Sequence, residues 1–143
     1  MSYISCGNSA LIAPSSYPFG AVGSVVVPTL LTGVATASLA VADAFNAIVL
    51  PKGVWMMSGT LEVEGATGNV LSSSVQCLLN GATNQGQLIS NYPTNTNQGI
   101  PICYTLVSDG NDAVSLAVSC ATSAGTWSIQ AGASSLLKLV KVA

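Results

Sequence analysis

Residues 54–64 alternate their side chains between two faces with a period of two, the period of a β-strand that buries one face. One face carries Trp55, Met57, Gly59, Leu61 and Val63. The other face carries Val54, Met56, Ser58, Thr60, Glu62 and Glu64. Because the two glutamates share the second face, we expect that face to point to solvent. No stretch of the chain combines helical spacing with helix caps, so the pattern predicts an all-β fold.

The same period recurs in other short segments that turn residues separate. Two further predicted inner faces carry Val114, Leu116, Val118 and Cys120, and Val75, Cys77 and Leu79. The predicted strands are 24–31, 34–41, 45–50, 54–64, 73–79, 86–91, 99–107, 112–121, 125–130 and 134–142. Turns are predicted at 51–53, 65–69, 80–81, 109–111 and 131–132, where Asn, Asp and Gly supply the positive backbone angles of tight turns.

About eight to ten short antiparallel strands of this kind predict two packed sheets, and we expect a single jelly-roll β-sandwich. The 143 residues suit one domain with one core. The alanines of 34–48 would also suit a helical turn, although we expect strand there. Charged residues, the usual protection of exposed strand edges, are scarce, so closure of the jelly roll and oligomer contacts are expected to protect the edges instead.

Residues 1–23 lack sustained alternation and contain Pro14 and Pro18, so we interpret them as an extended N-terminal arm before a jelly-roll domain at 24–143. The arm carries the apolar side chains Tyr3, Ile4, Leu11, Ile12, Tyr17 and Phe19. We expect these residues to contact a capsid or another partner. An arm folded back on its own domain is an equally open alternative.

Only 6% of the residues are charged, against about 25% in an average soluble protein. Residues 1–42 and 65–108 contain no charged side chain, and short neutral polar residues replace the missing charge. Such a surface suits a protein that neighbours cover better than a monomer that must stay soluble alone. The cations are Lys52, Lys138 and Lys141, too few for a basic patch, so nucleic-acid binding is not expected.

Residues 21–50 are the most apolar stretch, but Pro28, Gly33 and Asp43 interrupt it, so no membrane span is expected. The N-terminus has no basic region followed by a compact apolar one, so no signal peptide is expected. The cysteines are Cys6, Cys77, Cys103 and Cys120, and no pair has CxxC spacing. We interpret them as small buried residues in a reducing cytosol, with disulfides as the alternative.

Nothing in the sequence predicts catalysis, so we expect no enzyme and no cofactor. Histidine is absent, which removes the usual imidazole base. Glu62 and Glu64 would suit a paired-carboxylate site, but two glutamates on a solvated strand face are the simpler interpretation. Asp109 and Asp112 flank a turn that resembles part of a calcium loop, although it has too few oxygen ligands, and a simple tight turn is favoured.

The polar stretch 91–98 is a candidate recognition loop. Tyr92, Asn95 and Asn97 are its possible receptor contacts, and a plain surface loop is the alternative. Trp127 would also suit stacking on a sugar, although a core position on its predicted strand is favoured.

Three segments together resemble the C1q/TNF-like jelly-roll family. In residues 50–60, LPKGVWMMSGT, a Pro-x-Gly turn leads into a strand whose Trp55 would fill the core. Residues 106–116, LVSDGNDAVSL, are similar to the hairpin before the long inner strand of that fold. Residues 132–142, GASSLLKLVKV, resemble its closing strand. Together they span residues 45–143 in the family's order and spacing.

The resemblance implies a homotrimer around a three-fold axis. In phages and other viruses, similar small jelly rolls are capsid decoration (cement) proteins, head fibres, spikes and fibre tips. The chain lacks the collagen-like stalk and signal peptide of the animal members. We therefore expect a virion protein on the capsid surface, assembled in the host cytoplasm, which binds and stabilises the capsid shell. A receptor-binding or glycan-binding tip of a phage fibre or spike is the alternative.

Overall fold

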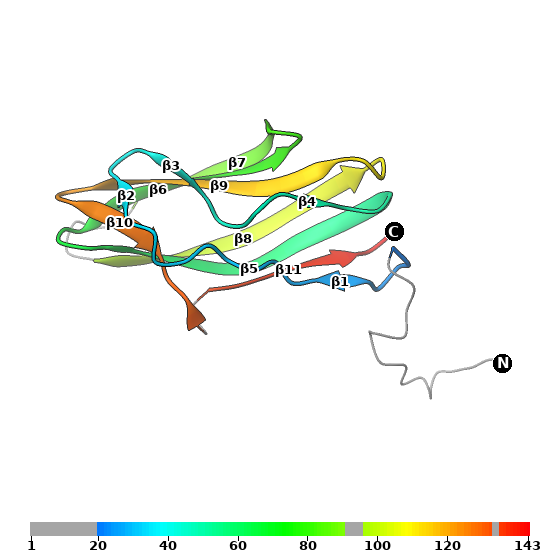
Figure 1. Ribbon diagram of the computed structural model, residues 1–143, viewed down its shortest axis with the longest axis horizontal. Coiled ribbons are helices and arrows are strands. Elements are labelled where there is room, and N and C mark those ends of the chain that lie inside the picture. Colours follow the sequence, from blue (N-terminus) through cyan, green and yellow to red (C-terminus); the bar gives the residue numbers. More distant parts are fainter. Residues whose placement is uncertain (1–19, 91–95, 133–134) are drawn as a thin grey trace.

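The computed structural model describes residues 20–90, 96–132 and 135–143. Over these residues the chain forms strands and no α-helix, which confirms the predicted all-β fold. The strands form two antiparallel sheets that lie one above the other as a β-sandwich (Figure 1).

The first sheet, here the β5 sheet, is built around the long strand β5 (Gly53–Gly65). One edge of β5 pairs with β8 (Asn97–Ser108) from Gly53 opposite Ser108 to Glu64 opposite Asn97. The other edge pairs with β11 (Leu136–Lys141) and, further along, with β10 (Thr126–Ile129). The short strands β1 (Val25–Val26) and β2 (Thr36–Ala37) extend the sheet beside β11 and β10.

The second sheet, here the β9 sheet, has β9 (Ala113–Thr122) between β6 (Val70–Leu79) and two short strands. These are β3 (Val41–Asp43) and β4 (Ile48–Val49), which pair with different parts of β9. The hairpin strand β7 (Ala82–Ser90) forms the other edge beside β6. The turn between β6 and β7 is at Asn80 and Gly81, as predicted, and both have positive φ.

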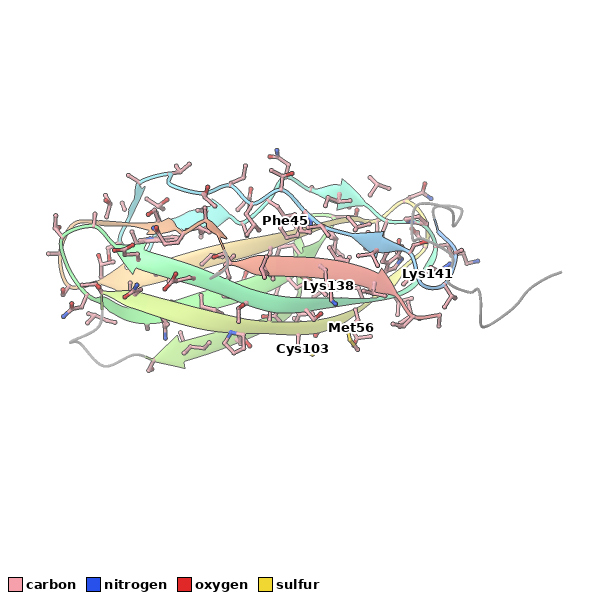
Figure 2. All side chains as sticks on the ribbon, turned by 90° about the horizontal axis from the view of Figure 1, so that it is seen from below. Phe45, Met56, Cys103, Lys138 and Lys141 are labelled. Carbon is pink, nitrogen blue, oxygen red and sulfur yellow. The ribbon has the colours of Figure 1, made fainter. Side chains whose placement is uncertain are left out.

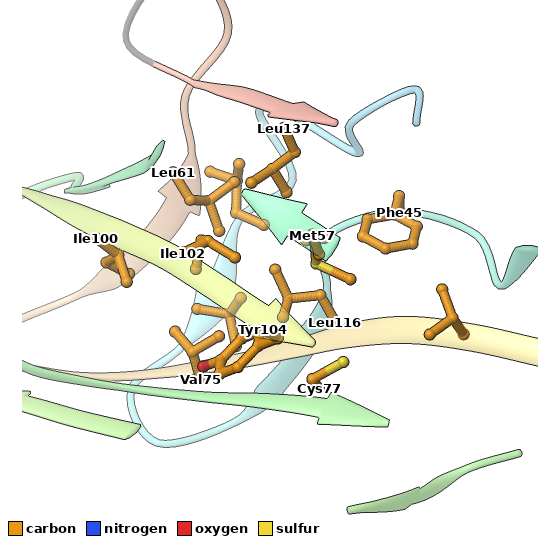
Figure 3. Packing of buried hydrophobic residues seen from close by; sticks show 14 of the residues in the cluster. Phe45, Met57, Leu61, Val75, Cys77, Ile100, Ile102, Tyr104, Leu116 and Leu137 are labelled. Atoms are coloured by element: carbon orange, nitrogen blue, oxygen red, sulfur yellow. The ribbon is translucent and has the colours of Figure 1, made fainter. Parts of the chain in front are cut away.

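The core lies between the sheets and follows the predicted alternation. Trp55, Met57, Leu61 and Val63 of β5 are fully buried, and so are Val114, Leu116, Val118 and Cys120 of β9. Trp127 of β10 is also fully buried, and its indole N–H donates a 3.0 Å hydrogen bond to the carbonyl oxygen of Ala37. Figure 3 shows part of this cluster, in which β5 and β8 face β6 and β9.

The predicted strands before residue 50 are wrong in extent. Residues 24–31 pair only at β1 and at a single bridge from Leu30. The β1 ladder stops at Val26, because the register would place Pro28 opposite Leu137 and proline has no N–H to donate. Residues 34–41 pair only at β2 and at the start of β3, since the chain turns at Leu39, where φ is +67°. Residues 45–50 pair only at β4 and at an isolated bridge between Leu30 and Phe45. The alanine-rich stretch forms no helix.

Candidate interaction surface

The outer face of the β5 sheet carries several exposed apolar side chains. Because side chains alternate along a strand, the residues between the buried positions of β5, β8 and β11 all point to this side. We define the outer face by Val25, Val54, Met56, Ser58, Thr60, Pro101, Cys103, Thr105, Val107, Leu136, Lys138 and Val140. Figure 2 looks onto it and labels Met56, Cys103 and Lys138.

Large apolar side chains on this face stay in contact with solvent. The exposed fractions are 68% for Val107, 61% for Leu136, 44% for Val25 and 39% for Met56. Cross-strand pairing places Val25 beside Val140, and Val140 beside Met56, so three strands contribute to one apolar row. A row of this kind on a soluble protein indicates a contact surface rather than scattered surface residues.

The outer face carries almost no charge. Lys138 is the one charged residue among those that define it, and the register places Ser58 between Lys138 and Cys103. Glu62 and Glu64 continue the same side of β5 beyond the face. The side chain of Glu62 accepts a 3.2 Å hydrogen bond from the amide nitrogen Nδ2 of Asn97. A contact across this face would therefore desolvate one cation and otherwise neutral groups.

The outer edge of the β5 sheet along β8 is already occupied. The side-chain nitrogen of Gln85 donates a 2.6 Å hydrogen bond to the carbonyl oxygen of Thr105, and that of Gln87 donates a 2.8 Å bond to Pro101. Both glutamines come from β7 of the opposite sheet. Pro101 suits this edge because its missing N–H would have pointed outward. Two side chains thus take the place of a neighbouring strand.

The residues predicted to contact partners lie mostly outside the described residues. Those outside the described residues are Tyr3, Ile4, Leu11, Ile12, Tyr17, Phe19, Tyr92 and Asn95. The described chain begins at Gly20, whose carbonyl oxygen accepts a hydrogen bond from the ammonium group of Lys141, so the arm joins the domain at the end of β11. Asn97 is exposed at the start of β8, which makes the last two residues of the predicted loop part of a strand.

The positions of Cys103 and Trp127 decide two predictions about single side chains. Cys103 was expected to be buried, but it points outward from β8 and is exposed. Cys77 and Cys120 are buried as expected, and burial raises the pKa of each thiol to about 11. All three described cysteines are free thiols. Trp127 cannot form a sugar-stacking surface, because its side chain is fully buried.

The carboxylate of Asp112 accepts two hydrogen bonds in the turn before β9. One oxygen of Asp112 accepts a 2.7 Å hydrogen bond from Asn80, and the other accepts a 3.0 Å bond from the backbone N–H of Asp109. Together with the side-chain bond from Asn80, the Asp109 amide holds the pKa of Asp112 below its ordinary value. This is the tight turn that the sequence favoured. Within 20–90, 96–132 and 135–143, no three metal-ligating side chains gather, and no helix is long and apolar enough to cross a membrane.

Comparison with models of known protein families finds no match, and comparison with curated proteins finds no relative.

Proposed function

We propose that this protein is a non-enzymatic structural protein of a virus particle, a homotrimeric decoration protein that binds and stabilises the capsid shell. The observation that carries the proposal is the outer face of the β5 sheet. It exposes Val25, Met56, Val107 and Leu136 on a rigid sheet, with Lys138 as its one charge. A monomer would keep this face in water at a cost, whereas an assembly covers it.

The strand order supports the jelly-roll part of the proposal. From β5 the chain passes to the opposite sheet for β6 and β7, returns for β8, crosses again for β9, and returns to the β5 sheet for β10 and β11. Repeated crossing between two antiparallel sheets is typical of jelly rolls. Trimer formation would add avidity, because three weak contacts to a shell act together.

Electron microscopy of the purified protein, alone and in its native assembly, tests this function. We expect discrete trimers alone and three-fold protrusions on a shell. A paired binding measurement uses Met56→Glu, which charges the outer face, and Val41→Glu, which charges the 68% exposed Val41 on the β9 sheet. Shell binding should fall at least tenfold for the first variant only. A monomer with catalytic activity, or equal binding by both variants, would contradict the proposal.

A further inference from the structure

A hollow lies at the border of the outer face, where β11 begins. It has a volume of about 300 Å³ and is lined by Val27, Ser58, Gly59, Leu136, Leu137 and Lys138. Ser58 and Gly59 of β5 give it a shallow floor because they have little or no side chain. Val27 is 70% exposed and Leu136 is 61% exposed. The hollow is small for a drug-sized ligand and suits one or two apolar side chains.

The glycine in this floor is required by the backbone of the neighbouring strand. A Cβ atom on Gly59 would lie 1.9 Å from the carbonyl oxygen of Leu136, and Gly59 has a φ of +139°. β5 and β11 can therefore approach each other closely only with glycine at this position. The same requirement leaves no side chain above the floor, so the hollow is a consequence of how the two strands pair.

Beyond Val26 and Leu139, the edge of β11 beside the hollow has no ladder partner among the described residues. The backbone N–H of Lys141 donates a hydrogen bond to the carbonyl oxygen of Ser24, the residue before β1. Backbone groups point to alternate sides along a strand, so those of Leu139 and Leu137 point toward the β1 side as well. The β1–β11 ladder ends at Val26 and Leu139, because Pro28 would stand opposite Leu137 and has no N–H. Leu137 thus presents its backbone outward next to an apolar hollow, in contrast to the β8 edge that Gln85 and Gln87 cover.

We infer that the N-terminal segment of a second copy, residues 1–19, docks in this hollow and along the edge of β11 at Leu137. This inference rests on the self-association part of the proposed function and not on the virion role. The segment carries no charged side chain, so its burial against Lys138 adds no like charge, and its carbonyl oxygens can accept hydrogen bonds from the ammonium group. It supplies large apolar side chains, among them Tyr17 and Phe19.

Length and position favour a second copy over the same molecule. Nineteen residues can span up to about 60 Å when extended, which is ample to reach a neighbouring protomer. Within one molecule, β1 occupies the strip beside β11 between Gly20 and the hollow. The segment would have to cross over β1 to lie beside Leu137, and such crossings are rare. A segment from a neighbour approaches from solvent without that crossing.

Peptide binding tests the inference directly. A fluorescent peptide of residues 1–19 is titrated into protein that lacks residues 2–19, and anisotropy reports binding. We expect saturable binding that Leu136→Glu weakens at least tenfold. The matched control is Val107→Glu, which charges an equally exposed side chain on the same face but outside the hollow, and it should change affinity less than twofold. No saturable binding, or equal losses in both variants, would overturn the inference.

A mixing experiment separates the second copy from the same molecule. Full-length Leu136→Glu keeps the segment but has a charged hollow, whereas the protein without residues 2–19 keeps the hollow but has no segment. We expect a mixed complex by sedimentation velocity that is larger than any complex that either protein forms alone. Binding of the peptide without a mixed complex would assign the segment to its own molecule and overturn the inference.

The mass of the full-length wild-type protein distinguishes the two proposals. If it is an oligomer but the peptide does not bind, the docking inference fails and the proposed function stands. If it is a monomer at every concentration, the self-association part of the proposed function fails.

Discussion

The hydroxyl of Ser73 on β6 donates a 2.5 Å hydrogen bond to the side-chain oxygen of Gln98 on β8, which links the two sheets inside the core. Both residues are buried, with 0% and 7% of their surface exposed, and the Ser73 oxygen also lies 3.4 Å from the sulfur of Cys120. A buried amide oxygen without a partner is costly. The bond therefore stabilises the relative position of the two sheets.

Ser73→Ala should lower the free energy of unfolding by about 1–3 kcal/mol, because it leaves the Gln98 oxygen buried without its donor. The double variant Ser73→Ala with Gln98→Met removes both polar groups and should lose less than the sum of the single losses. Urea unfolding of the four proteins measures this coupling. Additive losses would show that the bond does not link the two residues energetically.

Gly59→Ala should lower the free energy of unfolding by about 2–4 kcal/mol, since its Cβ would clash with the carbonyl oxygen of Leu136 at a positive φ. Gly99→Ala is the matched control, because nothing lies within 4 Å of a Cβ at Gly99 on the neighbouring strand β8. That variant should stay within about 0.5 kcal/mol of the wild type. Similar stability of the two variants in urea unfolding would contradict the close approach of β5 and β11.

Tyr104→Phe should stabilise the protein by about 1 kcal/mol, against the usual effect of such a substitution. The hydroxyl oxygen of Tyr104 is buried and has no hydrogen-bond partner among the described residues. Figure 3 shows the Tyr104 ring in the core cluster with Cys77. Desolvation by burial raises the pKa of the Tyr104 phenol, and the electrostatic effect of Cys77 raises it further by a smaller amount. Thermal unfolding measures the change, and a clear loss of stability would indicate a partner for the hydroxyl.

Asp112 should stabilise the folded protein at neutral pH and lose this effect in acid. Its folded pKa is lowered, so the stabilisation is present above its ordinary carboxyl pKa of 3.8 and disappears as the pH falls through the folded value. Asp112→Asn should therefore be less stable than wild type at pH 7, and the difference should shrink below about pH 4. Unfolding curves at both pH values measure it. Asp43→Asn removes an exposed carboxylate from the same sheet and controls for net charge. If its stability depends on pH as strongly as that of Asp112→Asn, the result would contradict the role of the Asp112 turn.

The sequence predicted the long strands because each has one buried face. The alternation in 54–64 identified the inward side chains of β5, including Trp55, and the turn residues Asn80 and Gly81 separated β6 from β7. The short strands were harder, because 24–31 and 34–41 are apolar without having pairing partners along their length. Pro28 is the residue whose missing N–H should have limited the first of them.

The candidate surface depends on which strands pair with one another, and the alternation within each strand does not show this pairing. Composition indicated a surface that neighbours cover, but it could not say that Met56, Cys103 and Lys138 come together on one sheet face. That grouping follows from the pairing of β5 with both β8 and β11. Gln98 illustrates the same limit, since it belongs to a polar stretch in the sequence and is buried opposite Ser73 in the fold.

The molar mass of the wild-type protein and of Met56→Glu, by sedimentation equilibrium over a hundredfold range of concentration, shows whether the outer face of the β5 sheet holds a trimer together. Met56 is partly exposed in the middle of the outer face, so a glutamate there leaves the core intact but places a charge in any contact across the β5 sheet. We predict the mass of three chains for the wild type and of one chain for the variant. A wild type that remains a single chain throughout, or a variant with the wild-type mass, would show that the outer face does not hold a trimer together.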